Sequence, residues 1–281
     1  MKTILRTFVG CTAILFGTAC MGAVKYVPEN MKVELSLKVP GNNAVNYKLH
    51  PDKLENSYFD YEWRSDNKLP ITVFHKVEER DSCMRLTVQL TAAQDVYFNY
   101  RQLLSTGYRH DNCQFYMPGF WYRRNLRSPK KAPSFHTSDS WLVREDRLSA
   151  PLTGIFSEKE KRFMTVNRLD DFSMDALATH KEGEIILSGK TSLGFTGFEN
   201  QQGIAMLSFG FPYREAPKSY IRKLTLAPEV EAFQLMKKGE SVLLTWEIME
   251  SGADDFSDFI QHTWEHCYDT YCLLYTSPSP R

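Results

Sequence analysis

The hydrophobic positions of residues 31–250 recur with a period of two. In the stretch MKVELSLKV, for example, Val33, Leu35 and Leu37 alternate with charged or polar side chains. This alternation is typical of strands with one buried face, because successive side chains of a strand point to opposite sides of the sheet. Turn-forming sequences such as Pro-Gly-Asn-Asn and Lys-Lys-Gly separate the runs. The pattern therefore predicts a mainly β fold, with one large antiparallel β-sandwich over residues 24–250.

After residue 250 the spacing of the apolar positions becomes helical. In DFSDFIQHTWEHCYDTY they form one stripe, made by Phe256, Phe259, Ile260, Thr263, Trp264, Cys267 and Tyr268. The spacing predicts a single C-terminal amphipathic helix within residues 251–271. One helix cannot bury such a stripe by itself, so it must pack on the sandwich or on further helices. We favour further helices, which makes residues 251–271 the first helix of a truncated helical domain.

Both ends of the chain have the composition of processed or foreign segments. Lys2 and Arg6 precede a short apolar run and a group of small residues, so we expect a secretory signal peptide at residues 1–23 and an exported protein, in the periplasm or at the outer-membrane surface. Cys20 follows small residues and leaves a lipid anchor open. Residues 272–281, CLLYTSPSPR, resemble a translated sequencing adapter, with a genuine Ser-Pro tail as the alternative.

The charge balance argues against a general nucleic-acid binder. Removal of Lys2, Arg6 and Arg281 from the 34 basic residues leaves 31 against 34 acidic residues, a net charge of −3. The chain has no phosphate-binding glycine loop and no paired Cys-x-x-Cys, so we expect no cofactor and no metal.

Three cysteines remain once both ends are set aside. These are too few for a disulfide-built scaffold, although a Cys83–Cys113 bridge stays open.

The densest unusual chemistry lies in residues 117–151, where the strand periodicity breaks and aromatic residues alternate with arginines. Aromatic rings stack on the apolar faces of sugars, and arginine forks bind carboxylates such as those of uronates. We expect the following residues to bind an oligosaccharide or polysaccharide: Trp121, Tyr122, Arg123, Arg124, Asp139, Trp141, Arg144 and Arg147. The alternative is that the tryptophans are core residues and that the charges pair with one another.

Two catalytic interpretations are weaker. Asp139 and Asp146 fit an acid/base pair for glycoside hydrolysis only at a separation that the sequence does not give, so the catalytic residues stay unknown. The order His262-x-x-Glu265-His266 matches that of inverted zinc proteases. We prefer a helix whose polar face carries two histidines.

The order of these parts resembles a known family. A signal peptide, a sandwich ending in KKGESVLLTWEIMES and an aromatic helix FSDFIQHTWEHCYDTY are similar to the N-terminal β-supersandwich of bacterial six-hairpin glycosidases. The stretches MPGFWYRRNLRSP and WLVREDRLS resemble those of exported polysaccharide-degrading proteins of Bacteroidetes. The resemblance implies that a helical barrel of the same chain carries the catalytic carboxylates.

We therefore expect the N-terminal, substrate-binding portion of an exported glycoside hydrolase. The alternatives are a non-catalytic glycan-binding surface lipoprotein and a zinc metalloprotease.

Overall fold

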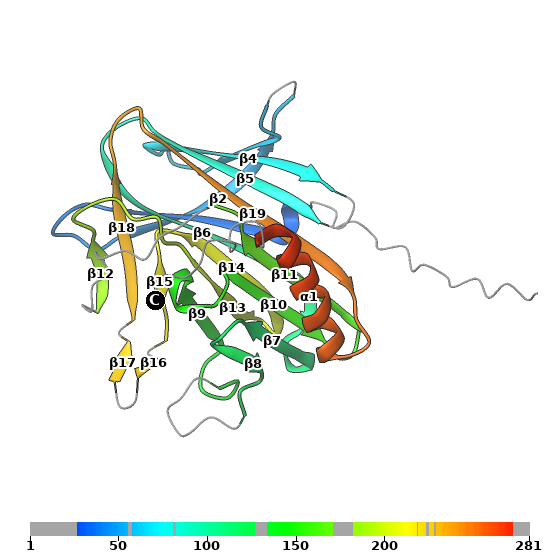
Figure 1. Ribbon diagram of the computed structural model, residues 1–281. Helices are drawn as coiled ribbons and strands as arrows, with labels where there is room; N and C mark the ends of the chain where they lie inside the picture. Colours follow the sequence, from blue (N-terminus) through cyan, green and yellow to red (C-terminus); the bar gives the residue numbers. More distant parts are fainter. Residues whose placement is uncertain are drawn as a thin grey trace, which may run out of the picture.

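The computed structural model describes residues 27–55, 58–80, 83–126, 134–170, 182–217, 219–222, 225–227 and 229–271. The expected signal peptide with Cys20 and the expected adapter tail lie outside these residues. The described residues form nineteen strands and one α-helix, which confirms the mainly β sandwich with a single C-terminal helix (Figure 1). None of the described helices combines the length and the apolarity needed to cross a bilayer.

Two large antiparallel sheets share strand β2. The first contains, in spatial order, β2 (Val45–Lys53), β1 (Met31–Lys38), β6 (Val96–Arg109), β14 (Ile204–Phe211), β13 (Phe195–Gln201) and β9 (Ser140–Arg144). The second contains β8 (Trp121–Arg123), β7 (Cys113–Met117), β10 (Leu152–Ser157), β11 (Arg162–Arg168), β19 (Ser241–Gly252), β5 (Met84–Ala92), β4 (Ile71–Glu79), β3 (Tyr61–Arg64) and again β2.

Smaller elements complete the fold. A third, small sheet places β18 (Val230–Met236) between β12 (Gly183–Ile186) and β15 (Arg214–Glu215), with the β12 pairing parallel. The remaining elements are the hairpin β16 (Ser219–Arg222) and β17 (Thr225–Ala227), the short 3-10 helices η1 (Pro28–Asn30), η2 (His110–Asn112) and η3 (Glu145–Arg147), and the helix α1 (Phe256–Tyr271).

The main core lies between the two large sheets. The predicted alternation holds in β5, where Leu86, Val88 and Leu90 are fully buried while their sequence neighbours are half-exposed. Trp246 of β19 packs across the core against Tyr100 of β6, with ring centroids 6.4 Å apart. The period-two pattern therefore specifies which face of each strand enters the sandwich.

Helix α1 covers the outer face of the second sheet, over β7, β10 and β11 (Figure 1). Asp255 begins the helix by accepting hydrogen bonds from the backbone N–H groups of residues 257 and 258. Phe259 is fully buried there, and its ring centroid lies 5.0 Å from that of Phe163 and 5.9 Å from that of Phe156. A second apolar cluster is thus built from one helix face and one sheet face.

This packing corrects the argument that drew further helices from the apolar stripe. Phe256, Phe259 and Cys267 are buried on the sheet, so the strands already cover most of the stripe. Only its flank is open, where 41% of Trp264 and 65% of Tyr268 are exposed.

Two other expectations are also corrected. Cys83 and Cys113 are both free, because Cys83 lies in the cluster under α1 while Cys113 lies in the main core. Residues 117–151 are not one long loop, since β8 and β9 both fall within them. These strands have three and five residues, too few for the alternation to be recognised.

The close approach of α1 to the sheet generates a stability prediction. A Cβ atom at Gly154 of β10 would lie 2.6 Å from the Phe259 ring, which its neighbours hold in place. We expect Gly154→Ala to lower the free energy of unfolding by about 1–3 kcal/mol, the usual cost of overpacking, measured by urea denaturation. Gly252→Ala is the matched control, because the nearest atom to its Cβ lies 3.7 Å away. Equal midpoints for the two variants would contradict the packing.

Candidate functional site

The two tryptophans expected to bind sugar are core residues. Trp121 and Trp141 are 0% and 2% exposed, and their ring centroids lie 5.1 Å apart. The Trp121 indole N–H donates to the Arg123 carbonyl at 2.8 Å. Neither ring presents a face to solvent, so neither can stack on a ligand.

Most of the expected charged residues have partners within the protein. Arg144 binds Asp146 through two nitrogens, at 3.0 and 2.5 Å, and Arg147 binds Glu215 at 2.5 Å. Asp139 accepts from the Asn200 side chain at 3.0 Å. The alternative of mutually paired charges thus describes these residues, although Arg147 pairs with a carboxylate far away in the sequence.

Arg124 serves the backbone of the neighbouring turn. Its Nε donates to the Cys113 carbonyl at 3.1 Å, and a terminal nitrogen donates to the Asp111 carbonyl. Its guanidinium carbon lies 4.9 Å from the centre of the Phe135 ring. These contacts hold η2 against the chain after β8.

A buried ion pair that the sequence analysis missed lies behind these arginines. Glu145 and Arg168 are 0% and 3% exposed, and their side chains bind each other at 2.7 Å. The Gly194 N–H also donates to Glu145 at 2.7 Å. Burial raises the pKa of the Glu145 carboxyl, while Arg168 and the Gly194 N–H oppose that rise. The sequence around Glu145 contains no signal that identifies Arg168 of β11 as its partner.

The remaining two expected residues, Tyr122 and Arg123, lie at the exposed end of β8. Tyr122 is 52% exposed, and its ring centroid lies 5.3 Å from that of the buried Tyr116. Burial raises the pKa of the Tyr116 hydroxyl, and the Trp264 indole lies close enough to that hydroxyl to lower its pKa against this effect. Tyr116 therefore joins the exposed rings of β8 and α1 from behind.

We call the surface formed by Tyr122, Arg123, Trp264 and Tyr268 the aromatic edge. Arg123 has a φ of 59°, in the left-handed region that side chains rarely adopt, and it ends β8. Its guanidinium carbon lies 5.0 Å from the centre of the Phe256 ring at the start of α1. The aromatic edge thus combines a cation and three exposed rings on two packed elements. The sequence analysis named Trp264 only as a member of the helical stripe.

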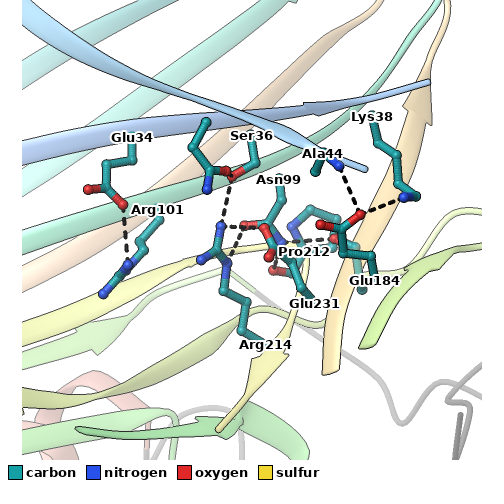
Figure 2. Close-up of polar contacts among 12 residues, drawn as sticks. Glu34, Ser36, Lys38, Ala44, Asn99, Arg101, Glu184, Pro212, Arg214 and Glu231 are labelled. Atoms are coloured by element: carbon teal, nitrogen blue, oxygen red, sulfur yellow. Dashed lines mark hydrogen bonds and ion pairs between the residues drawn. The ribbon is translucent and has the colours of Figure 1, made fainter. Parts of the chain in front are cut away.

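A second group of charges ties the small sheet to the first large sheet. Figure 2 shows Arg214 of β15 donating to Asn99 of β6 at 2.8 Å and to Ser36 of β1 at 3.0 Å, while it pairs with Glu231 of β18 at 2.6 Å. Burial lowers the pKa of the Arg214 guanidinium, and Glu231 opposes this effect. Arg101 binds Glu34 at 3.2 Å beside it. We interpret this network as structural because its charges are largely satisfied internally.

A pocket of about 250 Å³ lies at the turn between β3 and β4. Its lining includes Trp63, Arg64, Asn67, Lys68 and Thr72. Trp63 is 3% exposed, so the pocket presents no open aromatic face.

The expected zinc motif is not assembled. His262 pairs with Asp258 at 3.5 Å, whereas His266 binds Glu247 of β19 at 3.1 Å. Glu265 points to solvent and accepts from Gln261. Within the described ranges these three motif residues form no cluster of metal-ligating atoms, because the two histidines face different neighbours.

Comparisons with known proteins give fold-level likenesses only. No family model and no curated protein matches the chain. A solved polysaccharide lyase aligns with 80% of this chain at 14% identity and a TM-score of 0.37, and the Slr1438 protein of Synechocystis aligns with 77% of it at 7% identity and 0.39. A putative kojibiose phosphorylase from the human microbiome aligns with 85% at 4% identity and 0.32.

The chain spans 26% of the lyase, 73% of the Slr1438 chain and 24% of the phosphorylase. Likeness at this level transfers no activity and no residue role to this protein. The similarity to six-hairpin glycosidases stays an expectation.

The buried pair of Glu145 and Arg168 generates the second prediction. Arg168→Met leaves a carboxylate in the core without its partner, so we expect the free energy of unfolding to fall by about 3–5 kcal/mol. The matched control is Arg64→Met, which removes an exposed pair with Asp52 and should cost less than about 1 kcal/mol. Urea denaturation measures both. A similar small loss in both variants would show that Glu145 is not held by Arg168.

Proposed function

We propose that this protein is the saccharide-binding β-sandwich of an exported glycan-processing enzyme, and that it binds sugar at the aromatic edge. The observation that carries the proposal is the exposure of Tyr122 and Trp264 next to the same buried ring, that of Tyr116, with Arg123 over Phe256 at the start of α1. Folded domains seldom leave neighbouring large rings open to water without a binding role.

The chemistry of the edge suits a sugar ring better than a purely apolar ligand. The rings supply flat faces for the C–H groups of a pyranose, and the phenol groups supply polar rims. Arg123 adds a fork that fits the carboxylate of a uronate. Because β8 and α1 both pack against Tyr116, the rings are held in place before a ligand arrives.

The wider part of the proposal concerns the context of the domain. The signal-like N-terminus supports export. A helical catalytic domain in the same chain is what the resemblance to six-hairpin glycosidases implies, and the buried stripe of α1 gives it no support. A glycan-binding surface lipoprotein anchored at Cys20 is the alternative, and it uses the same aromatic edge. The zinc protease is not proposed, because the motif residues face different neighbours.

The third prediction tests the edge directly. We expect Tyr122→Ala and Trp264→Ala each to weaken binding to the polysaccharide ligand by about tenfold or more, as loss of a central aromatic anchor does. Affinity electrophoresis against a panel of neutral and uronate polysaccharides identifies the ligand, and calorimetry measures the change. Arg123→Ala should weaken binding to uronate polymers more than to neutral ones.

The controls separate this surface from other exposed rings. Tyr58→Ala removes a ring that is 70% exposed elsewhere, and it should leave binding unchanged. Arg64→Ala tests the pocket between β3 and β4. Melting curves verify that each variant is folded. Binding that survives both edge substitutions, or that is lost only in Arg64→Ala, would exclude the aromatic edge as the sugar site.

A further inference from the structure

Three residues that commonly bind metals meet where the last turns of α1 lie against the sheet. Cys83 precedes β5, Glu247 lies in β19, and His266 lies on α1. One ligand atom from each lies within 4.8 Å of the other two. Among the described residues this is the group whose ligand atoms converge in this way.

The group is buried in an apolar environment. Cys83 and Glu247 are each 4% exposed, and 16% of the His266 side chain is exposed. Cys83 belongs to the same apolar cluster as Phe163 and Phe259. Polar groups buried in such a place are costly unless they are well partnered, so their convergence calls for an explanation.

The carboxylate is already oriented for a ligand. One oxygen of Glu247 accepts from Arg85 at 2.9 Å, and the other faces His266 at 3.1 Å. One carboxylate oxygen is therefore fixed by an arginine, as outer partners fix metal ligands, while the other faces the imidazole.

We propose that Cys83, Glu247 and His266 form a zinc site that fastens α1 to the sandwich. A thiolate, an imidazole and a carboxylate are the ligands that Zn²⁺ takes, and three protein ligands leave a fourth position for water. On binding, the Cys83 thiol releases its proton to solvent, and the proton on the His266 nitrogen that faces Glu247 moves to the other ring nitrogen or to solvent. The sulfur and the freed nitrogen then each form a bond to zinc, without oxidation or reduction. The site replaces the expected helical motif and uses only one of its histidines.

Neighbouring charges limit the affinity without preventing coordination. The thiolate and the Glu247 carboxylate balance the two positive charges of the cation. The guanidinium of Arg85 therefore leaves one positive charge beside the site. Arg85 is 29% exposed, and water screens that charge. Its contact is to the carboxylate oxygen that does not face His266.

Cobalt spectroscopy of the full 281-residue chain provides the test. The reduced protein is titrated with Co²⁺ without oxygen and then with Zn²⁺. We expect one equivalent of Co²⁺ to give a thiolate-to-metal absorption band with the intense visible bands of a four-coordinate ion, and Zn²⁺ to remove them. Cys83→Ser should lose the thiolate band, and His266→Gln should bind at least tenfold more weakly, which is about 1.4 kcal/mol. Zn²⁺ should raise the melting temperature of the original protein but not that of these two variants.

Matched controls use the same residue types elsewhere. Cys113→Ala removes another buried thiol, and His262→Gln removes the other histidine of the helix. Both should keep the cobalt spectrum. Absence of a thiolate band in the original protein would overturn the site, whatever the variants do, and would leave a hydrogen-bonded group without metal. A spectrum lost in His262→Gln but kept in Cys83→Ser would also overturn it. Sugar binding at the aromatic edge does not depend on either outcome.

Discussion

The packing of Phe259 into the outer face of the second sheet is the contact on which the C-terminal part of the structure depends. The ring fits only because position 154 has no side chain, and Phe156, Phe163 and Tyr116 surround it. Once this ring is seated, the rotation of α1 about its own axis is fixed. Residues four and seven or eight positions further along then face predictable neighbours, because the helix repeats every 3.6 residues.

The sandwich itself follows from local pattern, whereas the candidate site does not. The alternation that includes Leu86, Val88 and Leu90 predicts a half-buried strand, because it extends over the nine residues of β5. Strands β8 and β9 are too short to show that alternation. The sequence therefore suggests that Trp121 and Trp141 lie in a loop, although both side chains are buried in the core. A pattern reports burial only where an element is long enough to repeat it.

Long-range ion pairs are the other part that sequence could not supply. Arg214 meets Ser36 across 178 positions, and Arg147 meets Glu215 across 68. Nothing near either arginine in the sequence identifies its partner, since pairing is set by which strands become neighbours. Arg144 and Arg147, expected to be available to a ligand, are each held by a carboxylate in a largely buried position. Arg123 differs because its guanidinium lies over the Phe256 ring, with the Asp255 carboxylate only near enough to feel its charge.

The apolar stripe of α1 contains both buried and exposed residues. Its inner positions, Phe256, Phe259 and Cys267, are explained by the sheet beneath them. Its flank, Trp264 and Tyr268, is not covered by the sheet, and Trp264 lies near the Tyr116 ring that also contacts Tyr122 of β8. An amphipathic pattern therefore identifies the apolar face of a helix. It does not distinguish the apolar residues that the fold buries from those that stay exposed. His266 lies two positions after Trp264, so the seating of Phe259 that exposes the indole also directs the imidazole towards Glu247. Both proposed sites, the aromatic edge and the zinc site, would then require that α1 is held in one rotation about its own axis.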